Sequence, residues 1–452
     1  MTPRSIIVAL SAVGLLVAGC TPAEEPPEVP DEVGTDEGAS AREGLDDPTE
    51  QDTEGQDEDE RWDDDPLVVG DGDPEVLAAL EQIAGQVAEL RDLEVRSPIH
   101  LDVVSSEELV EIARELNEEA IDDERLARRD DRQRALETLH LLPVGIDLDE
   151  AGEAMIEVGV LGLFAPLTER AYAVADDGEL SPAVSSTVAH ELLHALQHQH
   201  FGLDRLTDID EPDERFALAS VVEGDAVLIE EAWIEENLDE EQQEERTLQF
   251  ARLGAAAQET FDELPDYLLI KQLQPYSLGE RFVSRLLEEG GQEALNAAIA
   301  DPPRTSAEVR DPQLYLDGFT PTDPPPLTAP EGDWHELHSS RFGAWQVDVY
   351  SATMPRGHPP IGQYWRGGQM ESWIDDEGRV IAAFSVTFDG DAATTFCERL
   401  PTWYEHHTEA DVANDGTWST GQDVAVLDCD DQNVRLAIAP DRTLAESIVG
   451  DG

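Results

Sequence analysis

The sequence has almost no lysine, few cysteines and, beyond its first twenty residues, no long apolar run. Lys271 is the only lysine, and 28 lysines and arginines stand against 102 aspartates and glutamates, for a formal net charge of -74. Phosphate binding needs clustered basic residues, so we expect no nucleic-acid partner. An acidic excess combined with lysine loss is typical of halophilic proteins, because high salt screens the self-repulsion of such a surface.

The one apolar run, over residues 6–17, is too short for a membrane span. It follows Arg4 and falls below the about 20 residues that cross a bilayer, which is typical of a signal peptide. Val17-Ala18-Gly19-Cys20 resembles the lipobox at which bacterial signal peptides are cut and the new terminal cysteine is acylated. We therefore expect a lipoprotein signal peptide at 1–20 and an extracytoplasmic protein of the cell envelope, anchored to the membrane by lipid on Cys20. An ordinary secreted protein is the alternative.

Cysteine is equally scarce, since only Cys397 and Cys429 remain besides Cys20. In an exported chain, two leftover cysteines are more often paired than catalytic or metal-bound. The sequence therefore favours a disulfide between them.

The segment after Cys20 is rich in Pro, Gly, Asp and Glu and has almost no large apolar residue. Residues 21–65 hold 20 acids and 2 arginines, which leaves 82 acids and, after Arg4 is also subtracted, 25 bases from Pro66 onward. Such a segment cannot bury enough surface to offset its chain entropy. We predict a disordered acidic tether over residues 21–72, and we expect the folded part itself to be strongly anionic.

The remaining roughly 380 residues are enough for two domains. Apolar spacing predicts helices over 73–141, 185–200, 215–237, 241–258, 264–273, 278–289 and near 392–404. Alternation and apolar runs predict strands at 168–174, 380–386 and 424–427. Prolines between 321 and 330 mark a boundary. We predict an α+β fold, with a mostly helical domain and small edge sheet at 73–325 and a small α/β domain at 331–452.

The segment His190-Glu191-Leu192-Leu193-His194 carries the clearest chemistry in the chain. Two histidines four residues apart lie on one face of a helix, so both imidazoles can reach one Zn²⁺ ion. Glu191 then projects beside the metal and can take a proton from an attacking water. The motif is short, but it lies in an apolar helix that follows a predicted strand. We therefore predict a zinc site with Glu191 as general base.

The sequence leaves more than one candidate for the third ligand. His200 has the spacing of the metzincin signature H-E-x-x-H-x-x-G-x-x-H, but Gln197 replaces the glycine that turns the chain back to the metal. Glu223, on the next predicted helix, is favoured, and another acid such as Glu230 is the remaining candidate. We interpret His198, in helical register with His190, as a supporting or surface residue.

The segment around Glu223 also carries a family resemblance. Glu223-Gly224-Asp225-Ala226 is similar to the third-ligand segment of a group of uncharacterised HExxH lipoproteins, and the arrangement resembles that of gluzincins, in which a glutamate from the following helix completes a His, His, Glu site. Later segments, around 275–283 and 305–315, resemble the same group. The resemblance implies a zincin-like fold and an oxyanion donor outside the metal helix, for which Tyr276 and Arg310 are candidates. It also implies small residues, Gly224 and Ala226, that let the metal helix and the next helix approach closely.

These features together predict an extracytoplasmic zinc metallopeptidase that hydrolyses peptide bonds of a peptide or protein substrate. The alternatives are a non-catalytic envelope lipoprotein that retains the zincin fold as a binding module and a zinc hydrolase acting on other substrates. We interpret residues 73–141 as part of the peptidase domain rather than as an inhibitory prosegment. An acidic surround of the site would favour basic or neutral peptides.

Overall fold

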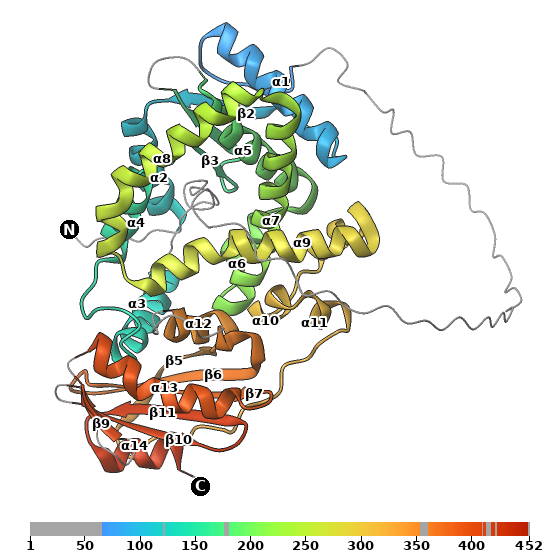
Figure 1. Cartoon of the computed structure of the whole chain (residues 1–452). Coiled ribbons are helices and arrows are strands. Elements are labelled where there is room, and N and C mark those ends of the chain that lie inside the picture. Colours follow the sequence, from blue (N-terminus) through green and yellow to red (C-terminus); the bar gives the residue numbers. More distant parts are fainter. Residues whose placement is uncertain are drawn as a thin grey trace, which may run out of the picture.

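A computed structural model describes residues 66–120, 123–175, 180–352, 360–408, 410–412, 417–420 and 423–450. It has a mixed helix and sheet architecture, with mostly helical segments in the first part and a separate sheet in the second (Figure 1). The signal peptide and lipid anchor predicted for residues 1–20, and the tether as far as residue 65, lie outside the described residues. Within these described ranges, no helix is both long enough and apolar enough to cross a membrane.

The described residues form the following helices and strands. The helices are α1 (Pro74–Arg91), α2 (Ser106–Ala120), α3 (Asp123–Thr138), α4 (Leu148–Glu157), α5 (Pro182–Phe201), α6 (Arg205–Asp208), α7 (Pro212–Asn237), α8 (Glu240–Glu263), α9 (Asp266–Ala300), α10 (Ser306–Arg310), α11 (Pro312–Leu316), α12 (Ala344–Ala352), the 3-10 helix η2 (Ile361–Tyr364), α13 (Ala392–His407) and α14 (Arg442–Val449). The strands are β1 (Val68–Val69), β2 (Ile99–Val104), β3 (Gly162–Ala165), β4 (Arg170–Val174), β5 (Trp334–Arg341), β6 (Trp365–Asp375), β7 (Val380–Phe388), β8 (Asp411–Val412), β9 (Thr417–Thr420), β10 (Asp423–Cys429) and β11 (Asn433–Ala439).

The first sheet has four strands in the order β1-β2-β4-β3. Strands β1, β2 and β4 run parallel, and β3 runs antiparallel to β4 at the edge. The residues of β3 and most of β4 are buried, because α5 packs against both strands. The edge strand β3 and the strand β4 therefore precede and support the helix that carries His190 and His194.

Two predictions about the N-terminal part were wrong. Residues 73–141 are not helical throughout, because β2 separates α1 from α2 and pairs with both β1 and β4. Its alternating Ile99, Leu101 and Val103 form a strand pattern that the stronger helical spacing on either side concealed. The predicted tether is also too long, since β1 lies within residues 66–72 and pairs with β2. Residues 73–141 thus contribute the second strand of the sheet.

The helices between 264 and 289 also differ from the prediction. One long element, α9, spans both predicted helices and continues to Ala300, with Pro275 inside it. Gly291 interrupts its helical geometry with a φ of 61°, a left-handed conformation that glycine adopts without strain. A proline at position 275 therefore did not end the helix, whereas the glycine sixteen residues later bends it.

The second sheet is antiparallel and has seven strands in the order β5-β6-β7-β11-β10-β9-β8. Alternate residues of β7 point to opposite faces, so that Phe384 and Val386 join one buried cluster while Ile381 and Ala383 join another. Helix α13 packs on the first face and α14 on the second. The predicted strands at 380–386 and 424–427 and the helix near 392–404 are present as β7, β10 and α13.

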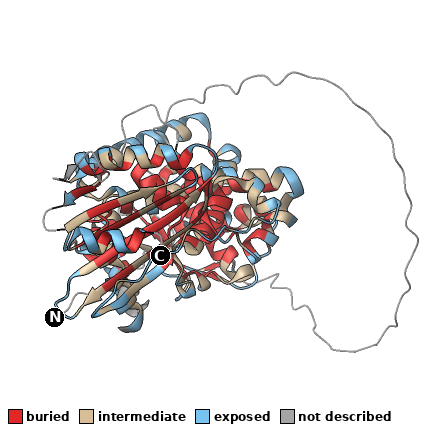
Figure 2. Cartoon of the chain, turned by 90° about the horizontal axis from the view of Figure 1, so that it is seen from below, coloured by how far each residue is buried: buried red, intermediate tan, exposed pale blue. Residues whose placement is uncertain are grey.

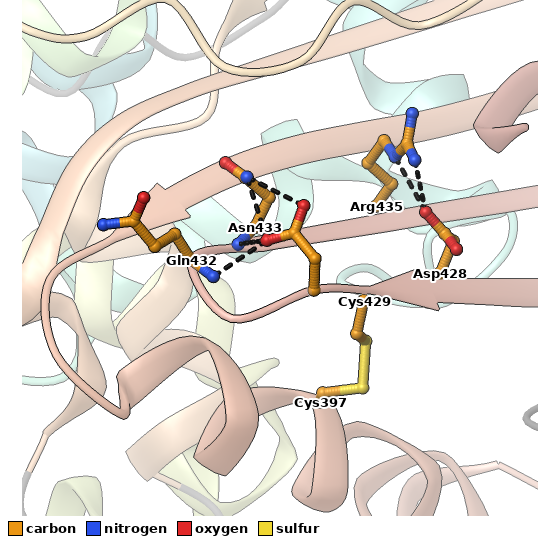
Figure 3. The surroundings of a disulfide bond; sticks show 7 residues. Cys397, Asp428, Cys429, Gln432, Asn433 and Arg435 are labelled. Atoms are coloured by element: carbon orange, nitrogen blue, oxygen red, sulfur yellow. Dashed lines mark hydrogen bonds and ion pairs between the residues drawn. A yellow bond between two sulfur atoms is a disulfide. The ribbon is translucent and has the colours of Figure 1, made fainter. Parts of the chain in front are cut away.

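Cys397 of α13 and Cys429 at the end of β10 form a disulfide (Figure 3). It joins the helix to the sheet that the helix covers, and 32 residues separate the two cysteines in sequence. The pairing favoured from the sequence is the one that the structure shows.

The largest buried cluster is shared by the helical part and the second sheet. It contains Leu136 of α3, Phe216 of α7 and Phe282 of α9 together with Trp345 of α12 and Phe384 of β7. Figure 2 shows buried residues concentrated on the strands and inner helices, with exposed residues on the outer helices. The second sheet is therefore held against α3, α7 and α9 by apolar packing.

Candidate metal centre

Helix α5 carries the histidine motif, and its ends are defined by local sequence. The Ser181 side chain accepts a hydrogen bond from the Val184 backbone N–H, Pro182 occupies the first turn, and Gly202 ends the helix in the left-handed conformation, with a φ of 67°. The motif lies near the middle of this helix, and almost all of its central residues are buried. The histidines are therefore held on a rigid element in the protein interior.

Glu223 of α7 lies against both motif histidines. One oxygen, Glu223 Oε2, is 3.2 Å from His190 Nε2 and 3.4 Å from His194 Nε2. All three side chains are buried, and their ligand atoms lie within 4.8 Å of one another. His190, His194 and Glu223, the metal group, can together bind a metal ion. The structure thus brings together the three metal ligands that the sequence favoured.

The second ring nitrogen of His190 faces another acid. Glu230 Oε2 is 3.4 Å from His190 Nδ1, and Glu230 Oε1 accepts a hydrogen bond of 2.8 Å from Arg246 Nη2. Arg246 also donates to Ser186 Oγ at 2.8 Å, which ties it to α5. Glu230, considered from the sequence as a possible third ligand, instead lies behind His190. A carboxylate in this place orients the imidazole so that Nε2 faces Glu223.

His194 is oriented by an amide. His194 Nδ1 donates to Gln197 Oε1 at 2.8 Å, and its Nε2 is directed towards Glu223. The Gln197 amide nitrogen donates to the Val222 carbonyl oxygen at 3.1 Å and to Asp225 Oδ2 at 2.8 Å. Gln197 therefore links the two helices of the site. Gln197, which stands where the metzincin signature has glycine, therefore positions His194.

Asp225 is held in turn by a buried arginine from the N-terminal helix. Arg91 Nε lies 2.8 Å and 2.9 Å from the two carboxylate oxygens of Asp225, and both side chains are fully buried or nearly so. The rest of the guanidinium donates to Gln292 at 2.6 Å and to Asn296 at 2.8 Å. A buried charge needs such partners on every side. The chain of contacts from His194 through Gln197 and Asp225 ends on α1 and α9, and these are the contacts that sequence reasoning missed.

The field at the site is negative. Burial acts to raise the pKa of Glu223, but the two nearby histidines outweigh it and lower the pKa to about 2, so the carboxylate is ionised. Burial acts to lower the pKa of His190, but Glu223 and Glu230 raise it well above its usual value. Carboxylates that attract a proton to an imidazole attract a metal cation to the same position.

Tyr276 of α9 lies beside the metal group. Its ring stacks on that of His190, with centroids 6.1 Å apart and planes inclined by 22°. The close packing of α7 and α9 brings it there, because a Cβ on Gly224 would lie 2.1 Å from the backbone of Gly279 and one on Gly279 would lie 1.8 Å from the Ser220 carbonyl oxygen. Gly224 was expected to admit the metal helix α5. Gly224 instead allows α9 to pack closely against α7. Ala226 lies in the buried cluster that includes residues of α5.

Glu191 is buried next to the edge strand. A Cβ on Gly162 of β3 would lie 2.9 Å from Glu191 Cγ, so a glycine is required where the strand passes the side chain. The side chain is 1% exposed. The predicted general base is therefore enclosed between α5 and the edge strand β3.

The other candidates from the sequence are placed elsewhere. His200 Nε2 is 2.8 Å from the Glu94 carbonyl oxygen, and His198 Nδ1 accepts from the Leu203 backbone N–H at 3.2 Å, so neither joins the metal group. Arg310 is largely enclosed and forms an ion pair with Asp348 of α12. These contacts indicate structural roles for the three residues.

A cavity of about 530 Å³ adjoins the metal group, with Glu223 and Tyr276 in its wall. Its other walls come from α3, α4, α9 and β5, and they include several arginines and Lys271. The expected acidic surround is therefore wrong for this side of the site. Five arginines and Lys271 line this cavity, against the carboxylates of Asp210, Glu211 and Glu223.

No protein-family model, no curated protein and no solved structure matches this chain. The geometry of the site is therefore the basis for a functional proposal.

Proposed function

We propose that the chain is an extracytoplasmic, lipid-anchored zinc metallopeptidase of gluzincin-like design, with His190, His194 and Glu223 as metal ligands. The observation that carries the proposal is the convergence of these three donors on one buried point. Ligands bound tetrahedrally at about 2.0–2.1 Å lie roughly 3.3 Å apart, which agrees with the distances of 3.2 Å and 3.4 Å from Glu223 Oε2 to the two imidazoles. Two histidine nitrogens and one carboxylate are also one of the known donor sets of catalytic zinc sites.

The orientation of the ligands supports the same reading. Glu230 and Gln197 each engage the Nδ1 of one histidine, so that both Nε2 atoms face Glu223. Sites of this kind keep their ligands in place by such outer contacts. The edge strand β3 lies beside Glu191, where the zincin resemblance places the strand that aligns the substrate.

Bound zinc would polarise the scissile carbonyl and lower the pKa of an attacking water. Glu191 accepts the proton of that water as it attacks and then delivers the proton to the leaving amine. The Tyr276 hydroxyl donates a hydrogen bond to the oxygen that becomes negative. Burial of Glu191 keeps bulk water from competing for the proton.

Elemental analysis of the purified chain tests the site. We expect one zinc per chain in the wild type and none in Glu223→Ala, while His200→Ala, a matched change on α5 outside the metal group, retains zinc. Peptide hydrolysis is then measured with Glu191→Gln as control, which should keep zinc and lose activity. A wild type that holds no zinc after reconstitution would refute the proposal. A wild type that binds zinc but cuts no peptide would favour a binding module or another hydrolase.

A further inference from the structure

The cavity next to the metal group has the opposite charge balance to the rest of the chain. Its wall contains six cationic side chains and three carboxylates, namely Arg125, Arg128, Arg129, Arg132, Arg215 and Lys271 against Asp210, Glu211 and Glu223. In the whole sequence, 102 acids stand against 28 bases. Cationic side chains thus outnumber carboxylates two to one in the cavity wall, whereas acids outnumber bases more than three to one in the whole sequence. Surface composition alone does not produce such a reversal.

The cations come from three helices and face one another. The four arginines of α3 lie at positions 125, 128, 129 and 132, a spacing that puts them on one face of the helix. Arg215 comes from α7 and Lys271 from α9. Lys271 is exposed to solvent, and Arg132, Arg215 and Arg129 lie near enough for their charges to act on it. The one lysine of the chain therefore lies close to three arginines.

Only part of this positive charge is neutralised by the protein. Arg125 pairs with Asp208, Arg128 with Glu124, and Arg129 with Asp149, at 2.8 Å, 2.9 Å and 3.0 Å. Neighbouring acids therefore neutralise the charge of these three arginines at least in part.

The other three cations have no such partners. Across the parts of the chain that the structure describes, Arg132, Arg215 and Lys271 form no ion pair with a carboxylate. Arg215 donates through Nη2 to the Ile209 backbone carbonyl oxygen, which leaves its charge without a carboxylate partner. The cavity is therefore built to receive negative charge.

The cavity also connects with the proposed reaction centre. Glu223 and Tyr276 form part of its wall, and its volume of about 530 Å³ lies within the range of ligand pockets. His338 and Ser340 of β5 close another side, so the second sheet completes the cavity. A substrate held at the metal would extend towards the arginines. Guanidinium groups bind carboxylates and phosphates through two parallel hydrogen bonds, and carboxylates are the anions that a peptide substrate supplies.

We propose that this cavity binds carboxylates of the substrate next to the scissile bond and makes the site selective for acidic peptides. Only the selectivity for acidic peptides rests on the proposed peptidase function, because carboxylate binding can be measured without cleavage. The carboxylate belongs either to acidic side chains or to the C-terminus of the peptide, and both present the same chemistry to the arginines.

Four peptides of one sequence separate these sources. They carry either Glu or Gln at two positions and either a free or an amidated C-terminus. Binding is measured by fluorescence anisotropy on full-length, zinc-loaded Glu191→Gln, at the lowest salt at which circular dichroism shows the folded chain. We expect the Glu form or the free-acid form to bind about 10- to 100-fold more tightly than the Gln amide, as charged hydrogen bonds predict. Cleavage of the same four peptides by the wild-type chain is measured alongside.

Two variants locate the effect. Arg132→Gln and Lys271→Gln should each reduce the ratio of acidic to neutral peptide binding by about 10-fold. Arg285→Gln removes a charge of an exposed arginine that pairs with Glu289 on α9, and it should leave the ratio unchanged. Equal binding of all four peptides by the unsubstituted cavity overturns the proposal whether or not any peptide is cut. Selective binding without cleavage leaves the cavity proposal standing and refutes the peptidase function.

Discussion

Replacement of Gln197 by methionine tests whether the contacts behind the ligands set the metal affinity. The variant keeps an unbranched side chain of similar length but removes the hydrogen bonds to His194 at 2.8 Å, to the Val222 carbonyl at 3.1 Å and to Asp225 at 2.8 Å. His194 then loses the partner that fixes its tautomer and ring orientation. Loss of such a contact weakens metal binding by about 10- to 100-fold, which is about 1.4–2.8 kcal/mol.

The stability of the chain should fall as well, because Asp225 and the Val222 carbonyl each lose a donor in the interior. Asp225 Oδ2 keeps the Arg91 Nε donor at 2.9 Å, so the cost is that of ordinary hydrogen bonds, about 0.5–1.5 kcal/mol each. Asp225 keeps its pair with Arg91, so the fold is expected to persist. Zinc affinity is therefore measured by competition with a chelator at a temperature well below the unfolding midpoint, which is recorded by circular dichroism.

Gln199→Met is the matched control on the same helix. Gln199 accepts from the Arg96 backbone N–H at 2.8 Å and donates to the Ser97 carbonyl oxygen at 2.9 Å, and it is far less enclosed than Gln197. Its replacement should leave the zinc dissociation constant unchanged. If Gln197→Met binds zinc within about twofold of the wild type, the reasoning that His194 is positioned through Gln197 is wrong.

Three further predictions concern catalysis, the disulfide and pH. Tyr276→Phe should keep its zinc and its substrate binding but lower kcat by about 100-fold, because one donor to the developing oxyanion is lost; an unchanged kcat would remove Tyr276 from the mechanism. Serine at both Cys397 and Cys429 should lower the free energy of unfolding by about 3–4 kcal/mol, from the entropy of a 32-residue loop, and equal denaturation midpoints would contradict this. Burial, opposed in part by hydrogen bonds from Ser306, raises the pKa of Asp213 to about 7, above its unfolded value of 3.8, so the stability that this group contributes is present at low pH and is lost as the pH rises through 7. Between pH 5 and pH 8, Asp213→Asn should therefore gain roughly 2–3 kcal/mol relative to the wild type, and a difference that does not vary with pH would refute the assignment.

Local sequence was a good guide wherever a pattern repeats within one element. The helices that carry the metal group were predicted within a few residues, because their caps and apolar spacing lie in adjacent sequence. Strand β2 was missed because its six alternating residues lie between two longer segments with helical spacing. Only pairing with β1 and β4 makes it a strand. Helix α9 was divided at Pro275 because the packing that tolerates a proline there cannot be read from the chain.

The sequence by itself determined the candidate metal ligands, since the four-residue spacing of His190 and His194 is a property of one helix, and Glu223 was favoured from its place on the next. Only the tertiary structure decided what supports and surrounds these ligands. Arg91 reaches Asp225 across 134 residues, and Lys271 meets arginines of α3 across roughly 140 residues. Such contacts depend on how helices pack, and a charge that looks solvent-exposed in the sequence can face a cavity in the fold. The chain's strongly acidic composition therefore conceals a cationic cavity beside the metal group.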